Sequence, residues 1–79
     1  MNKGIETLGE NFEDWNSILK KSSKTSAEYT KAMSGMKKAV ADILDVSTDF
    51  VSSDFITSNM DDIALAAEGN AEAIERLRS

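Results

Sequence analysis

Large apolar residues recur every three or four positions near the start of the chain, with polar residues between them. The first stripe consists of Ile5, Leu8, Phe12, Trp15 and Leu19. This spacing places its members on one face of a helix, and it predicts a helix over about residues 4–22. Asn11 offers a rival start, because its side chain could cap a helix that begins at Phe12. The unbroken stripe through Ile5 favours the longer helix.

A second stripe follows after a short polar connection. It consists of Tyr29, Met33, Met36, Val40 and Ile43. The spacing predicts a helix over about residues 26–44, with Thr25 or Ser26 as its N-cap. Because the connection between the two helices is short, they are expected to pack antiparallel as a helical hairpin.

The stretch STDFVSSDFITSN breaks the helical stripe and repeats a small unit of hydroxyl, acid and apolar residues. Ser47 or Thr48, and later Ser53, are candidate caps of single turns within about residues 47–58. Two pairs of apolar residues lie there, Phe50 with Val51 and Phe55 with Ile56. One interpretation is that they plug the open end of the hairpin, and the alternative is that Phe50 and Phe55 form an exposed recognition surface.

The last twenty residues, MDDIALAAEGNAEAIERLRS, predict two short helices over about residues 60–68 and 71–78. Asn59 is the expected N-cap of the first, with an acid at the third helical position. Gly69 can adopt the left-handed conformation that ends this helix, and Asn70 can cap the next. Helices this short are marginal in isolation, so we expect both to lie on the hairpin as a lid.

These elements predict an all-α fold with one small domain over residues 1–79. The expected architecture is an antiparallel helical hairpin closed by two or three short helices, a small orthogonal or irregular bundle. The absence of Pro and the abundance of good helix formers agree with this prediction. The residues expected to be buried are Phe12, Trp15, Leu19, Met33, Met36, Val40, Ile63, Ile74 and Leu77.

Charge is distributed unevenly along the chain, whose net charge is −5. Residues 1–40 carry a small positive excess, whereas residues 41–79 are strongly acidic, and no Lys or Arg occurs between Val40 and Glu75. This argues against a nucleic-acid phosphate-binding face in the second half. It permits a basic partner or a mimic of nucleic-acid charge, and the plainer interpretation is a solvated acidic surface.

The residue types that most often perform catalysis or bind metals are missing. The chain has neither His nor Cys, which removes the usual general base at neutral pH and the thiol nucleophile. Asp42, Asp45, Asp49 and Asp54 suggest calcium, but Val46 occupies a position that needs a ligand and no central glycine follows. We therefore expect no enzyme activity, no cofactor and no specific metal site. No apolar run approaches the ~20 residues of a membrane span.

Protein binding remains the function that the residues allow. The candidate interaction surface comprises Phe50, Phe55, Asp61 and Asp62. The two aromatic residues would supply apolar contact area. The two acids are adjacent in the first turn of a predicted helix, where the positive end of the helix also accounts for them.

Three stretches resemble a region of the tail tape measure proteins of tailed phages and prophages. They are LGENFEDWNSILKKSSKTSAEYTKAMSGMKKAVADILDVS, then DFVSSDFITSN, then MDDIALAAEGNAEAIERLR, in this order and covering nearly the whole chain. The closest points are the helix around Trp15, the Ser-Ala-Glu-Tyr start at 26–29, and the runs ADILDVS and AAEGNAEAIERLR.

The resemblance implies a segment of a much longer structural protein, made in the host bacterial cytoplasm and placed in the virion tail. Members of the family set tail length and are bound by tail tube and tail assembly proteins. No binding residue of the family maps onto this chain, because the matching positions are core and cap residues. Since 79 residues cannot form a whole ruler, we expect a compact docking or terminal module. The alternative is a free-standing small acidic binding protein, adaptor or inhibitor.

Overall fold

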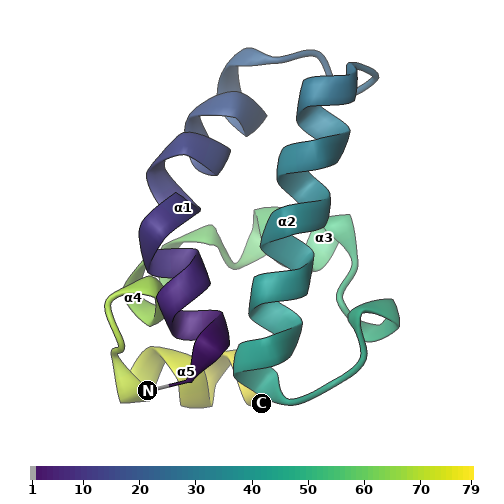
Figure 1. Cartoon of the computed structure of the whole chain (residues 1–79). Coiled ribbons are helices and arrows are strands. Elements are labelled where there is room, and N and C mark those ends of the chain that lie inside the picture. The colour runs from purple at the N-terminus through teal and green to yellow at the C-terminus, as the bar shows by residue number, and fades with distance from the viewer. Residues whose placement is uncertain (1) are drawn as a thin grey trace.

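Five α-helices and one turn of 3-10 helix make up the computed structural model, which describes residues 2–79 (Figure 1). The elements are α1 (Lys3–Lys21), α2 (Ala27–Leu44), the 3-10 helix η1 (Thr48–Phe50), α3 (Ser53–Ser58), α4 (Met60–Ala67) and α5 (Ala71–Arg78). The described residues contain no β-strand, so the predicted all-α class is confirmed. The principal-axis extents are 32 × 22 × 19 Å.

The helical hairpin is formed by α1 and α2, which run antiparallel (Figure 1). Asn2, for which the apolar stripe gave no prediction, caps α1. Its side-chain oxygen accepts hydrogen bonds from the backbone N–H groups of Gly4 and Ile5. The rival start at Asn11 is wrong. Its side chain lies within α1 and donates to the carbonyl of Thr7 at 2.9 Å.

Polar side chains cap most of the remaining helices. Ser26 caps α2 by accepting from the N–H of Tyr29, and Ser52 rather than the expected Ser53 caps α3. Asn59 occupies the expected N-cap position of α4, and its carbonyl accepts from the N–H of Ile63 at 2.9 Å. Its side chain makes no capping bond there, because the side-chain amide donates back to the carbonyl of Phe55 at 2.8 Å. Asn59 therefore ends α3 and begins α4.

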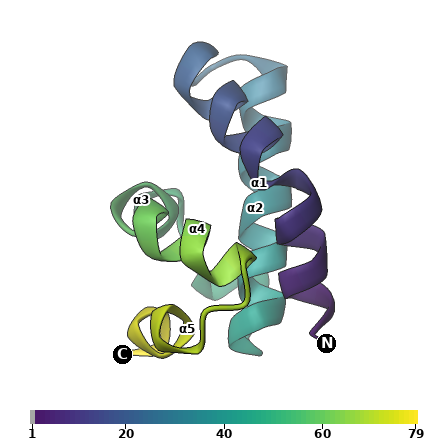
Figure 2. The ribbon, with the colours of Figure 1, turned by 90° about the vertical axis from the view of Figure 1, so that its left-hand side faces the viewer.

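The short helices cover one side of the hairpin. Figure 2 shows α3, α4 and α5 over the half of the hairpin that holds the start of α1 and the end of α2. In the described residues α4 packs on α1, whereas α3 and α5 pack on α2. Gly69, with φ of 83°, makes the left-handed turn between α4 and α5, and Asn70 caps α5 through the N–H of Ala73 at 3.0 Å. The lid therefore consists of α4 and α5.

Both ends of the described chain hydrogen-bond to the last turn of α2. The Asn2 side-chain amide donates to the carbonyl of Asp42 at 3.4 Å. The Arg78 guanidinium donates to the carbonyl of Ile43 at 3.3 Å. The last carbonyls of a helix have no partner within it, so these side chains satisfy two groups that would otherwise depend on water.

The core lies where the hairpin meets α3 and the lid. Its large fully buried side chains are Leu8, Met36, Val40, Ile43, Ile56 and Ile63. Alanines 32, 39, 41, 66 and 73 are also buried, and their small side chains allow close approach of the helices.

The expected burial is correct for Met33, Met36, Val40, Ile63 and Leu77. It is wrong for Phe12, Trp15, Leu19 and Ile74, which are only partly buried and pack against the edge of the core. Figure 2 gives the reason for the later part of α1, because α3 and the lid stop short of the half of the hairpin near its turn. A side chain there meets its partner helix on one side and solvent on the other.

Candidate interaction site

The connection between α2 and α3 holds one aromatic side chain out in solvent. Asp45, in the left-handed conformation with φ of 58°, ends α2. Ser47 then caps η1, its hydroxyl accepting from the N–H of Asp49. At the end of this turn the side chain of Phe50 is 80% exposed, while that of the next residue, Val51, is 4% exposed. Phe50 thus faces solvent, whereas Val51 anchors the turn in the core.

The apolar residues between α2 and α4 were expected either to plug the open end of the hairpin or to form an exposed surface, and the structure gives a different answer for different residues. Val51 and Ile56 are buried and contribute to the core. Phe55 is partly buried against it, and Phe50 is exposed. The plug interpretation is therefore wrong for Phe50, and the exposed-surface interpretation describes its position.

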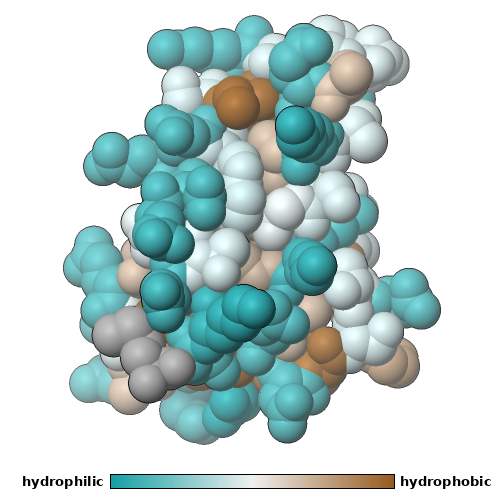
Figure 3. Space-filling model, in the orientation of Figure 1, coloured by the Kyte–Doolittle hydropathy of each residue, from teal (hydrophilic) through white to brown (hydrophobic). Residues whose placement is uncertain are grey.

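A groove of about 330 Å³ lies beside Phe50. It is lined by Leu44, Val46, Phe50, Val51, Phe55, Leu77 and Arg78. Val46, at 44% exposed, and Phe50 are the large hydrophobic side chains that stand clear of the surface in residues 2–79. Figure 3 shows brown surface at the lower right, over the end of α2 and the turn that follows it. We call this feature the Phe50 groove.

Exposed carboxylates are next to lining residues of the Phe50 groove in the sequence, although none of them belongs to the lining. Asp45 lies between two lining residues, and Asp49 and Asp54 directly precede Phe50 and Phe55. All three acids are exposed. Arg78 is the basic residue in the lining, and its guanidinium is already engaged by the carbonyl of Ile43 and by Glu75 at 3.5 Å.

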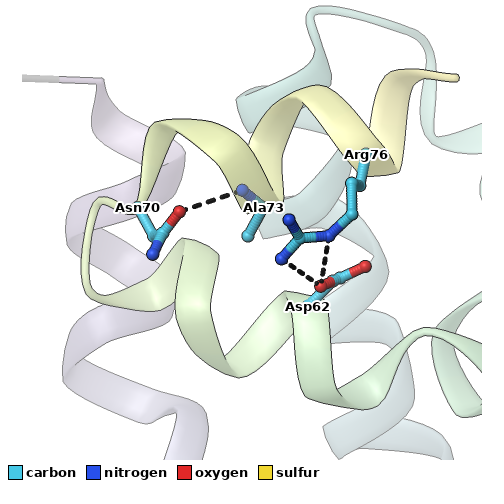
Figure 4. A network of polar contacts seen from close by, with 4 residues as sticks. All are labelled: Asp62, Asn70, Ala73 and Arg76. Atoms are coloured by element: carbon cyan, nitrogen blue, oxygen red, sulfur yellow. Dashed lines mark hydrogen bonds and ion pairs between the residues drawn. The ribbon is translucent and has the colours of Figure 1, made fainter.

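The two candidate acids at the start of α4 lie outside the Phe50 groove. Asp62 receives hydrogen bonds from Nε and Nη2 of Arg76 at 3.0 and 2.9 Å, which joins α4 to α5 (Figure 4). The carboxylate of Asp62, through these bonds and its charge, raises the pKa of the Arg76 guanidinium above its ordinary value. Asp61 is exposed beside it. The structure thus brings Phe50 and Phe55 together and gives Asp62 a structural role in the lid.

Five residues of the Phe50 groove were not among the candidate site residues, namely Leu44, Val46, Val51, Leu77 and Arg78. Leu44 and Val46 flank the end of α2, and Leu77 comes from α5. Leu44 and Val46 could have been recognised from the sequence, because they are apolar and follow Ile43, the last residue of the second stripe. Leu77 was expected to be buried, and no local pattern indicates that it meets Phe50.

Side chains with catalytic or ligating potential serve local structure. Ser26, Ser47 and Ser52 each accept a backbone N–H at a helix start. Over residues 2–79 no group of three or more Asp and Glu side chains is arranged to hold a metal ion. Within that same range, every helix is too short or too polar to cross a membrane.

Comparisons of this chain with protein-family models, with curated proteins and with solved structures find no match.

Proposed function

We propose that this chain is a non-catalytic interaction module, a compact segment of a phage tail tape measure protein that acts in tail assembly. Its support is the resemblance of three sequence stretches together with the way these stretches fold. Residues 8–47 form most of the hairpin, 49–59 form the connection and α3, and 60–78 form the lid. Each stretch contributes a fully buried side chain to one core, namely Met36, Ile56 and Ile63.

The observation that carries the proposal of a docking role is the short length of the folded unit. A single helix of this many residues would extend roughly 120 Å, at about 1.5 Å per residue. The longest axis of the fold is 32 Å. A ruler gains length from extension along one axis, so a segment folded back on itself is suited to docking or to closing an end.

The non-catalytic part of the proposal is supported by how the reactive side chains are used. The serines described above cap helices, and Asp62 pairs with Arg76 between the two helices of the lid. The exposed apolar side chains of the Phe50 groove, Val46 and Phe50, offer contact area to another molecule, and contiguous exposed apolar patches often mark such contacts.

An in-frame deletion of residues 1–79 from the phage gene that encodes them tests the proposal, with tails measured by electron microscopy. We expect aborted assembly or lost infectivity, with little change in the length of the tails that form. The matched control deletes an equally long segment of uninterrupted helix from the same protein, which should shorten tails by about 120 Å if the helix lies along the tail axis. Normal assembly with the same shortening in the test deletion would refute the docking role.

A second candidate is a free-standing acidic binding protein. The exposed acids next to lining residues of the Phe50 groove favour it, because an acidic surface needs no phage context to bind a basic partner. Reading the genomic frame on both sides of the coding segment, and searching purified phage particles for its peptides by mass spectrometry, separates the two. A native start and stop with no virion peptides would favour the free-standing protein.

A further inference from the structure

We propose that the Phe50 groove binds a basic amphipathic helical segment of another protein, which inserts one or two large apolar side chains beside Phe50. The inference rests on the proposed role as an interaction module and names the chemistry of its partner. It follows from the apolar lining, from the acids that neighbour lining residues in the sequence and from the size of the surface.

The lining provides a rigid anchor. Val51 and Leu77 are each 4% exposed and belong to the core, so they form a fixed floor. Phe50 projects beside them from a turn that the Ser47 hydroxyl caps. The capped turn fixes the backbone from which Phe50 projects, and aromatic side chains are frequent anchors of interfaces.

The charge of the chain segment that supplies most of the lining favours a basic partner, because residues 41–75 contain no Lys or Arg. Asp45, Asp49 and Asp54 are exposed next to lining residues, whereas Arg78 is paired with Glu75 and with a backbone carbonyl. Two lysines, Lys24 and Lys37, line a separate hollow that also includes Asp49. Lysines or arginines on the polar face of a bound helix would therefore meet an excess of carboxylates, which speeds association and disfavours acidic partners.

The size of the surface argues for a peptide-like segment rather than a second copy of the chain. Seven residues line the Phe50 groove, whereas a stable interface uses about 20–30 residues on each side. Two copies would also each bring a net charge of −5. A short helix that places spaced apolar residues in a groove needs only a small surface, and it can carry the positive charge that a second copy lacks.

The experiment uses the whole chain and a fluorescein-labelled peptide of about 14 residues, with leucines spaced 3 and 4 apart and lysines elsewhere. Fluorescence anisotropy gives the affinity, and amide shifts in ¹⁵N-labelled protein give the site. Two comparison peptides have glutamate in place of lysine, or the same composition in scrambled order. We expect saturable binding of the first peptide, with shifts confined to residues 44–55 and 77–78, and affinity lower by about tenfold or more for both comparison peptides.

Matched variants test the residues. Phe50→Ala should weaken binding by about tenfold or more, as for an interface anchor. The triple change Asp45→Asn, Asp49→Asn and Asp54→Asn should also weaken it, and Asn tolerates the left-handed conformation at position 45. The control makes the same charge change on exposed acids of α1, namely Glu10→Gln, Glu13→Gln and Asp14→Asn. It should leave binding nearly unchanged.

Three results would overturn the inference. Equal weakening by the two triple variants would mean unspecific charge attraction, and an unaffected Phe50→Ala would remove the anchor. A concentration-dependent dimer in analytical ultracentrifugation that Phe50→Ala abolishes would make a second copy the occupant. Each result comes from the isolated protein, so failure here is distinct from failure of the tail proposal, which is tested by deletion in the phage.

Discussion

The indole ring of Trp15 on α1 lies directly against Gly35 on α2. A β-carbon placed on Gly35 would come 2.6 Å from Cζ2 and 2.9 Å from Cε2 of that ring. Trp15 is only partly buried, since this part of the hairpin lies beyond the lid. The absence of a side chain at position 35 therefore lets the largest side chain in the protein pack across the hairpin.

Gly35→Ala should destabilise the protein by about 1 kcal/mol. Alanine favours the helix by up to about 1 kcal/mol over glycine, but overpacking in a filled contact costs about 1–3 kcal/mol. Because the ring must move outward, Trp15 emission should also shift to longer wavelength. Urea unfolding and fluorescence of the folded variant measure both effects.

The Trp15→Ala background provides the control for Gly35→Ala. With the ring gone, the added methyl group meets no obstacle, and Gly35→Ala should become stabilising by up to about 1 kcal/mol through helix propensity. A double-mutant cycle isolates the coupling of the two positions. If the change has the same effect in both backgrounds, the contact between Trp15 and Gly35 does not determine it.

Leu8→Ala should lower the free energy of unfolding by about 2–5 kcal/mol, because Leu8 is fully buried in the core. This is a large share of the stability of a chain of this size, at about 0.05–0.15 kcal/mol per residue. The matched variant is Leu65→Ala in α4, where the leucine is partly exposed. It should cost clearly less in the same denaturation series. Equal costs would mean that α1 does not pack on the lid as described.

Phe50→Ala should leave the free energy of unfolding within about 0.5 kcal/mol of its original value, as for other exposed positions. The ring is 80% exposed, so its removal opens no cavity. Ile56→Ala, at a fully buried position of the neighbouring α3, should cost about 2–5 kcal/mol. A strongly destabilised Phe50→Ala variant would show that the ring is packed in solution.

Arg76→Gln should lower the melting temperature slightly at low ionic strength and have almost no effect in 1 M salt. The guanidinium bonds to Asp62 across the two helices of the lid, but both side chains are accessible to solvent, so salt screens their attraction. Arg78→Gln is the comparison, because that arginine also bonds to a backbone carbonyl of α2. Its effect should persist at high salt.

The apolar stripes predict the two long helices well, because the spacing that forms a stripe is a property of residues within one helix. The Met33, Met36 and Val40 stripe is buried along α2, as its spacing predicts. The stripe of α1 is equally regular, yet Trp15 and Leu19 remain partly exposed. Burial there depends on how far the lid reaches, and no local pattern specifies that length.

The candidate site was less predictable, because it is assembled from distant segments. The sequence draws attention to Phe50 and Phe55 as isolated large residues in a polar stretch. It does not reveal that Leu77 on α5 completes their groove, or that Asp62 is engaged by Arg76, fourteen positions later. Asn59 shows that local sequence can also be ambiguous. Its side chain could cap the following helix or hydrogen-bond to the preceding turn, and the sequence allows both.

Asn2 and Arg78 bind to consecutive carbonyls of α2, and adjacent α-carbons are about 3.8 Å apart. Both ends of the described chain are therefore attached to the same turn of α2 through side chains, although the start of α1 and the end of α5 lie on opposite sides of the fold (Figure 2). A pull on the two ends would load these two side-chain contacts first. The ends would detach from α2 before the load reached the seam between α1 and α2.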